Sequence, residues 1–287
     1  MTIEHLINKK ERTDWGHVAT WYDKHLENDD TYHAKVILPN LIRLLGDMKG
    51  QSVLDLACGQ GYFALNWART AKQVYGVDLG LSLIKIAEEN YKKDKALNKK
   101  SNSNVEFYVS PADNLEMIKD NTLDKITCVL ALQNIEEVAE VFRECERTLI
   151  KGGCMYIVIN HPSFRNPRNT HWGWDAEKFI QYRRVDEYIS ENKAKIDMNP
   201  GQAAGPVGRS LGVVRGGDNG SGISKHTWSF HRPLQYYAKA ISKSGLLIGR
   251  IEEWTSHKAS QSGPRQKAED KSRKEIPMFM MMEIIKI

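Results

Sequence analysis

Short apolar runs alternate with longer stretches of helical periodicity through the first half of the chain. Short runs are typical of strands, and apolar residues that recur every three to four positions are typical of helices. The alternation predicts a parallel sheet with crossover helices. The expected strands are Ser52–Leu56, Gln73–Val77, Val105–Val109, Lys125–Leu130 and Cys154–Ile159, with helices at Tyr62–Ala71, Leu81–Leu97 and Glu137–Ile150. Further along, the pattern predicts a helix at Leu234–Ser244 and strands at Gly249–Trp254 and Pro277–Ile285.

Two regions break this alternation, one before the first strand and one after the fifth. The first is expected to form helices that bear aromatic side chains. The second contains Gly201–Gly222, where eight glycines in 22 residues predict a flexible segment or a mobile lid. We expect one domain made of an N-terminal helical cap (1–48), a ligand-binding half (49–160), an inserted substrate lid (161–232) and a C-terminal helix with the last two strands (233–287).

Composition and charge restrict the class of protein further. Lys and Arg total 41 against 36 for Asp and Glu, and the basic stretches Lys92–Lys100 and Arg265–Lys274 lack interleaved aromatic residues. We therefore predict no nucleic-acid partner. No apolar run reaches the roughly 18 residues of a membrane span, and no signal segment is seen, which favours a cytoplasmic protein. The cysteines form no CxxC pair and the histidines show no metal-ligand spacing, so we predict free thiols and no metal.

The segment Val53–Phe63 runs from an apolar strand through a turn of small residues into a helix. Gly59 and Gly61 would let a ligand approach the backbone at the helix N-terminus. The spacing also satisfies the dinucleotide fingerprint of oxidoreductases. Asp55 favours a different ligand, because a carboxylate beside the turn would repel a pyrophosphate and attract the sulfonium and ammonium groups of S-adenosylmethionine. A turn without any ligand is the plainer alternative.

The next strands also end in polar or small residues. Asp78 follows the second strand, where a carboxylate can accept both hydroxyls of a ribose, although an aspartate there can equally cap the next helix. Ser110–Asp113 follow the third strand and Val129–Asn134 end the fourth. We expect these two segments to form walls for an adenine ring.

The ordered set of these motifs resembles the class I S-adenosylmethionine-dependent methyltransferases, nearest to the type 11 and quinone C-methyltransferase branch. The resemblance covers about residues 15–160. It implies a Rossmann-like, seven-stranded, mostly parallel sheet with helices on both faces and an antiparallel last strand. It also implies S-adenosylmethionine as cofactor, with the turn on the methionine part, Asp78 on the ribose and the adenine between the later strand ends. The implied cofactor residues are Asp55, Ala57, Cys58, Gly59, Gly61, Asp78, Leu79, Ala112, Asp113 and Leu130.

The insertion is expected to hold a small-molecule methyl acceptor, because it begins at the ligand-binding edge of the sheet and is rich in aromatic residues. His161 is the first candidate for a catalytic base, and His231 and Tyr182 are the alternatives. Arg183 with Arg184 would suit an acidic acceptor. A histidine that only orients a turn, and tryptophans that only pack the insertion, are the structural alternatives.

Two other function classes stay open at this point. The fold could bind S-adenosylmethionine as a sensor or scaffold without catalysis, although the aromatic insertion favours an enzyme. A nicotinamide-dependent oxidoreductase is disfavoured by Asp55. The sequence determines neither the acceptor atom (oxygen, nitrogen or carbon) nor the oligomeric state.

Overall fold

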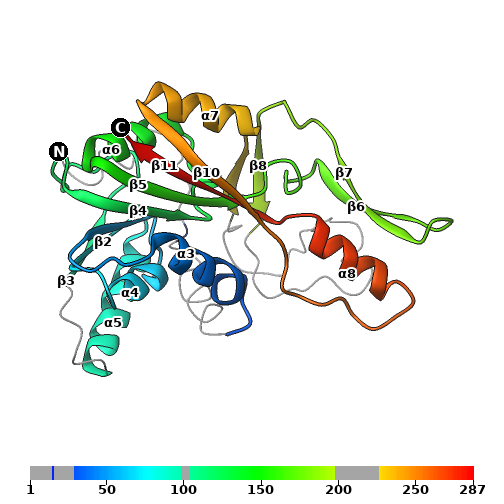
Figure 1. Ribbon diagram of the computed structural model, residues 1–287, viewed down its shortest axis with the longest axis horizontal. Coiled ribbons are helices and arrows are strands. Elements are labelled where there is room, and N and C mark those ends of the chain that lie inside the picture. The colour runs from blue at the N-terminus through cyan, green and yellow to red at the C-terminus, as the bar shows by residue number, and fades with distance from the viewer. Residues whose placement is uncertain (1–14, 16–28, 98–103, 198–225) are drawn as a thin grey trace, which may run out of the picture.

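The computed structural model describes residue 15 and residues 29–97, 104–197 and 226–287 of the chain. Its centre is a seven-stranded sheet in the order β10-β11-β5-β4-β1-β2-β3 (Figure 1). Only β11 runs antiparallel to its neighbours, β5 and β10. The strands of this sheet are β1 (Ser52–Leu56), β2 (Gln73–Asp78), β3 (Asn104–Val109), β4 (Leu123–Val129), β5 (Leu149–Asn160), β10 (Leu246–Trp254) and β11 (Phe279–Lys286).

Helices cover both faces of the sheet. Successive side chains of a strand point to opposite faces, so the sheet has an apolar cluster on each side. Met280, Met282 and Ile284 of β11 join one apolar cluster, whereas Phe279 and Met281 join the other. The first cluster is completed by α6 (Val138–Thr148) and α7 (Leu234–Lys243), and the second by the π-turn η2 (His33–Ile37), α3 (Leu38–Leu45) and α4 (Tyr62–Trp67). The remaining crossover helix is α5 (Leu81–Leu97).

The spacing of apolar residues explains how each helix finds its face. In α6 the buried side chains Val138, Val141, Phe142 and Cys145 recur every three to four residues and form one stripe. The predicted fold class is therefore confirmed, including the antiparallel last strand. Every strand and helix predicted from residue 49 onward is present, with ends shifted by a few residues.

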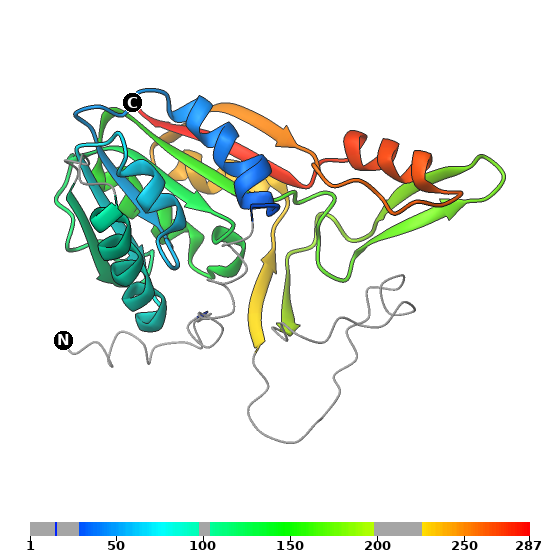
Figure 2. The same cartoon turned by 90° about the horizontal axis from the view of Figure 1, so that it is seen from below.

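The insertion after β5 forms two antiparallel hairpins that the apolar pattern did not predict. They are β6 (Thr170–Asp175) with β7 (Ile180–Val185), and β8 (Asn192–Asp197) with β9 (His226–His231). Figure 2 shows β8 and β9 projecting from the main sheet. Gly201–Gly222, and residues 1–14 and 16–28 of the expected N-terminal cap, lie outside the described residues.

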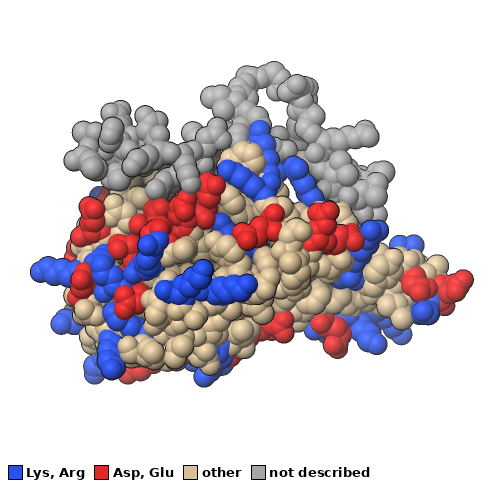
Figure 3. All heavy atoms as spheres, turned by 90° about the horizontal axis from the view of Figure 1, so that it is seen from above, with Lys and Arg blue, Asp and Glu red and all other residues tan. Residues whose placement is uncertain are grey.

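A C-terminal helix, α8 (Gln266–Glu275), packs beside β7. The Ser272 hydroxyl donates to the backbone carbonyl of Gln181 at 2.7 Å. This helix largely coincides with the basic stretch Arg265–Lys274. It was not predicted as a helix because the stretch has no apolar periodicity. On the face shown in Figure 3, basic and acidic side chains of the described residues are interspersed, as the small net charge leads one to expect.

Candidate cofactor site

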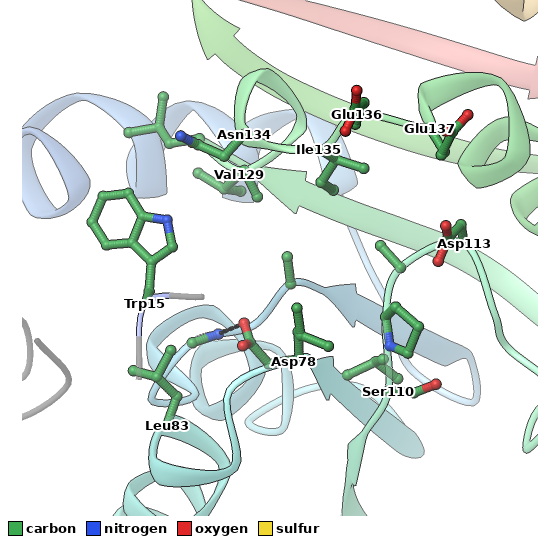
Figure 4. Close-up of a pocket in the computed structure, with 18 of the residues that line it drawn as sticks. Trp15, Asp78, Leu83, Ser110, Asp113, Val129, Asn134, Ile135, Glu136 and Glu137 are labelled. Carbon is green, nitrogen blue, oxygen red and sulfur yellow. Dashed lines mark hydrogen bonds between the residues drawn. The ribbon is translucent and has the colours of Figure 1, made fainter. Parts of the chain in front are cut away.

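A pocket of about 350 Å³ lies at the carboxyl ends of the parallel strands. The loops after β1, β2, β3 and β4 supply most of its wall, and Trp15 and Phe230 complete it (Figure 4). This edge is where open α/β sheets bind ligands, because the loops that connect strands to helices converge there. The sheet order therefore brings together segments that are separated in sequence by some 80 residues.

The turn after β1 exposes backbone to this pocket. Ala57 and Gly59 line it, with left-handed φ values of 58° and 56°. The turn is anchored to β2 because the amide of Cys58 donates to the carbonyl of Val77 at 3.0 Å. A left-handed conformation costs a residue with a Cβ about 1–3 kcal/mol, so Ala57 is a position where the surrounding structure enforces the turn.

Asp78, at the end of β2, is held in place by the turns on either side. Its Oδ2 accepts the amide of Gly59 at 2.9 Å, the contact drawn in Figure 4, and its Oδ1 accepts the amide of Gly80 at 2.8 Å. Both bonds fix the carboxylate at the pocket wall. Each carboxylate oxygen has more than one lone pair, so Asp78 can accept further hydrogen bonds from a ligand.

The far wall is apolar and is built by the ends of β3 and β4. Ala112 and Leu130 line it, with Asp113 beside them and Leu79 from the loop after β2. Leu130 has a left-handed φ of 52°, which marks an abrupt change of direction directly after β4. The amide of Leu130 donates to the carbonyl of Val158 at 2.7 Å, which ties this bend to β5. The pocket thus has an apolar wall as well as the carboxylates of Asp78 and Asp113.

Asp55 differs from its predicted position. Its side chain is only 1% exposed and does not line the pocket. One oxygen accepts the amide of Ala64 in the first turn of α4 at 2.9 Å, and the other accepts the hydroxyl of Thr127 at 3.0 Å. Burial raises the pKa of this carboxyl to about 7. Asp55 therefore positions the start of α4 and lies outside the lining of the pocket.

Cys58 and Gly61, which were also predicted at the cofactor, belong to the same turn but do not line the pocket. Cys58 is buried, with its pKa raised by burial. Gly61 has a φ of 84°, and a Cβ there would lie 3.1 Å from the Cβ of Ala87 and 3.3 Å from the ring of Phe107. Neither residue lines the pocket. The remaining predicted cofactor residues do line it, namely Ala57, Gly59, Asp78, Leu79, Ala112, Asp113 and Leu130.

The insertion contributes Phe230 to the pocket through contacts with the loop after β4. The 3-10 turn η3 (Leu132–Asn134) holds β9, because the side chain of Asn134 donates to the carbonyl of Trp228 at 2.8 Å. Arg232 donates to the carbonyls of Ile135 and Glu136 at 2.9 and 2.8 Å. Phe230 was not predicted as a site residue. Successive side chains on a strand point to opposite faces, so Phe230 and its neighbour His231 were not both expected to face the pocket.

None of the three predicted catalytic side chains lines this pocket. His161 is 5% exposed, and its Nε2 lies 2.5 Å from an Oε1 of Glu253 on β10. His231 is buried with its Nε2 2.8 Å from the carbonyl of Tyr188, and Tyr182 is 47% exposed on β7. Burial lowers the pKa of both histidines. The imidazole of His161 is turned toward Glu253 and lies outside the lining of the pocket.

Cysteine and metal chemistry add no second centre to the described part of the chain. The four cysteines are free thiols, and Cys154 is the one that is not fully buried. The described residues hold no group of three or more histidine, cysteine or carboxylate side chains arranged for a metal ion. None of the described helices has the length and apolar content that crossing a membrane requires.

The known proteins with similar sequences match the part of the chain that supplies most of the pocket's lining. A family model described as a methyltransferase domain matches residues 54–157. The ubiquinone biosynthesis O-methyltransferase of Acinetobacter baylyi is 26% identical over 153 residues, which cover 53% of this chain and 60% of that protein. The protein of the same name from Xanthomonas oryzae is 28% identical over 111 residues, 39% of this chain and 44% of the relative. The chain thus matches about half the length of these relatives.

Solved structures with the same fold cover nearly the whole chain. An S-adenosylmethionine-dependent methyltransferase from Mesorhizobium loti aligns with a TM-score of 0.60 and 22% identity over 90% of this chain and 99% of that one. One from Clostridium acetobutylicum aligns with a TM-score of 0.56 and 16% identity over 95% and 98% of the two chains. Residues 54–157 thus match a methyltransferase domain, and the whole fold is that of solved S-adenosylmethionine-dependent methyltransferases.

Proposed function

We propose that this protein transfers a methyl group from S-adenosylmethionine to a small-molecule acceptor. The charge of the pocket carries the proposal. Asp78, Asp113, Glu136 and Glu137 line it, and no Lys, Arg or His is among the described residues that do so. A pocket with this lining attracts the sulfonium and ammonium groups of S-adenosylmethionine and repels the pyrophosphate of a nicotinamide dinucleotide. These four carboxylates line the pocket, whereas Asp55 does not.

The shape and donor set of the pocket also fit this cofactor. A volume of about 350 Å³ is in the range of small-molecule sites. Asp78 is held by two backbone amides and can accept both ribose hydroxyls, and the apolar wall that includes Ala112 and Leu130 suits an adenine ring. Gly59 presents backbone without a side chain, which leaves room for the methionine part.

When bound, the cofactor supplies a methyl group already activated by its sulfonium, so the protein's task is to orient the acceptor and to exclude water. Trp15, Asn134 and Phe230 are the lining side chains that fit the acceptor half. Phe230 is positioned by the hydrogen bonds that join β9 to the loop after β4. The names of the relatives agree with an oxygen acceptor, which we propose as the first class to test.

Turnover distinguishes this function from a sensor that only binds the cofactor. The test incubates the protein with labelled S-adenosylmethionine and a panel of small phenols, amines and carbon acids, and follows label in the acceptor. Phe230→Ala should lower turnover at least tenfold while its affinity for S-adenosylhomocysteine stays within a few-fold of wild type. Phe179→Ala is the matched control, because Phe179 is 66% exposed at the tip of the β6–β7 hairpin. Cofactor binding without turnover on any acceptor would favour the sensor.

A further inference from the structure

A second, smaller cavity lies between the loop after β5, the β6–β7 hairpin and the end of α8. Its volume is about 80 Å³, and it shares no lining residue with the cofactor pocket. Three arginines line it, Arg165 from the loop, Arg183 from β7 and Arg273 from α8. Aromatic rings of Tyr32, Phe164 and Trp172 form the other walls. No carboxylate side chain is among the described residues that line it.

The arginines are held so that some of their donors remain available. Arg183 donates through Nε to the carbonyl of Phe164 at 2.9 Å and through Nη2 to the hydroxyl of Thr170 at 2.7 Å, and its guanidinium stacks 5.1 Å from the centre of the Trp172 ring. Arg273 donates through Nε to the hydroxyl of Ser260 at 2.9 Å. The described residues give neither the Nη1 of Arg183 nor the terminal nitrogens of Arg273 a hydrogen-bond partner.

The positive charge of this cavity has no ion-pair partner at contact distance in the described part of the chain, although Asp270 interacts with Arg273 electrostatically at longer range. None of the three arginines forms an ion pair there. The carboxylate of Asp270, on α8 like Arg273, instead accepts the amide of Ser260 at 2.7 Å. Burial lowers the pKa of Arg183 to about 10, and the charge of Arg165 adds to that effect. Arg165 has an exposed side chain, yet its surroundings desolvate the guanidinium enough to lower its pKa.

Strand geometry explains why one arginine of a neighbouring pair enters the cavity. Successive side chains on a strand point to opposite faces. Arg183 therefore turns inward, whereas Arg184 is exposed and its Nε lies 2.8 Å from an oxygen of Asp186. Of the two arginines expected to suit an acidic acceptor, only Arg183 lines this cavity, together with Arg165 and Arg273.

We propose that this cavity binds the oxyanion group, carboxylate or phosphate, of a small molecule. Guanidinium groups recognise both through charge-assisted hydrogen bonds. The volume admits such a group and excludes a whole nucleotide, for which sites of several hundred Å³ are usual. Phe164 and Trp172 would contact an apolar or aromatic body that carries the anion.

The test measures binding of phenyl phosphate, benzoate and inorganic phosphate to the full chain by calorimetry. Arg165→Gln should weaken phenyl phosphate binding at least tenfold, because it removes a charge from the cavity without breaking any hydrogen bond of the guanidinium among the described residues. Arg184→Gln, the matched control, should bind within twofold of wild type. Tighter binding of phenyl phosphate than of inorganic phosphate would assign the site to an anion on an aromatic body, and equal binding to the free ion.

Equal affinity in the Arg165→Gln variant and wild type, or no saturable binding of any of the three probes to wild type, would overturn the proposal. If circular dichroism shows that Arg165→Gln does not fold, Arg273→Gln tests the same cavity. The affinity for S-adenosylhomocysteine should be unchanged in either variant, since the two pockets have no lining residue in common. A failure here is therefore distinguishable from a failure of the proposed methyl transfer.

Discussion

Replacing Asp55 by asparagine tests whether burial of this carboxyl group beside α4 raises its pKa and so makes the stability of the fold depend on pH. In the wild type its oxygens accept the amide of Ala64 and the hydroxyl of Thr127, and Thr127 accepts the indole of Trp67 at 3.0 Å. Asparagine has the same shape. Its oxygen can still accept from Ala64 and its amide can donate to Thr127, whose hydroxyl then donates to the carbonyl of Leu54, now 3.4 Å away. The fold should therefore survive.

The size of the effect follows from the pKa of Asp55. Burial raises this pKa from 3.8 to about 7, so the folded protein keeps a proton that the unfolded chain has already lost. Stability is therefore lost as the pH rises from about 4 and levels off above about 7. The full difference corresponds to about 4 kcal/mol, of which about 2–3 kcal/mol is lost between pH 5 and pH 8.

The assay is urea unfolding of wild type, Asp55→Asn and the control Glu89→Gln, an exposed acid on α5, at several pH values from 5 to 8. The variant cannot ionise at this position, so its stability relative to wild type should rise by about 2–3 kcal/mol over that range. The control should follow the wild type. Parallel stability curves for wild type and Asp55→Asn would refute the reasoning, because they would mean that Asp55 ionises in the folded state as easily as in the unfolded one.

Two further substitutions separate structural from ligand-binding residues. Gly61→Val should cost about 2–5 kcal/mol of stability, and Gly152→Val about 1–3 kcal/mol. Both glycines have left-handed φ values, but only a Cβ at Gly61 would lie against Ala87 and Phe107. Equal costs in chemical unfolding would show that crowding plays no part. Burial lowers the pKa of His161, so the neutral imidazole contributes to the free energy of unfolding above pH 6.5, and this contribution is lost as the pH falls. The melting temperature of His161→Gln should therefore change less than that of wild type between pH 7 and pH 5. Its affinity for S-adenosylhomocysteine should stay within a few-fold of wild type, and a large loss would place His161 at the cofactor.

The sheet could be predicted from the sequence because its strands are short apolar runs with clear ends. Asp78 and Ala112-Asp113 are strand-end residues, and a parallel sheet brings such residues to one edge whatever the details of packing. That is why those positions line the pocket as expected.

The directions of side chains near the strand ends were harder to predict, because the order of residues along the chain does not determine where each side chain points. Asp55 precedes the turn, yet its side chain points to the amide of Ala64 and away from the pocket. His161 follows β5 at the correct edge, but the antiparallel β11 and β10 bring Glu253 close to it. A carboxylate 92 residues further along the chain cannot be identified as a partner from local pattern.

The hairpins of the insertion could not be predicted because their strands bury little apolar surface. In β7 exposed and half-buried residues alternate, with Arg183 and Arg184 at its centre. Helix α8 is almost wholly polar and is positioned by contacts such as Ser272 with Gln181. Both elements depend on long-range contacts, which also create the arginine-lined cavity.

Calorimetric titration of the full chain with S-adenosylhomocysteine, and separately with NAD, tests the central claim most directly. Saturable binding of S-adenosylhomocysteine is expected, with none of NAD at the same concentrations. Asp78→Ala should weaken that binding by about 10- to 100-fold, the usual cost of losing charge-assisted hydrogen bonds to two hydroxyls. Asp124→Ala is the matched control, because Asp124 also accepts a backbone amide, that of Ser52 at 2.8 Å, but does not line the pocket. Binding of NAD, or an affinity for S-adenosylhomocysteine that Asp78→Ala leaves unchanged, would contradict the assignment of this pocket to S-adenosylmethionine.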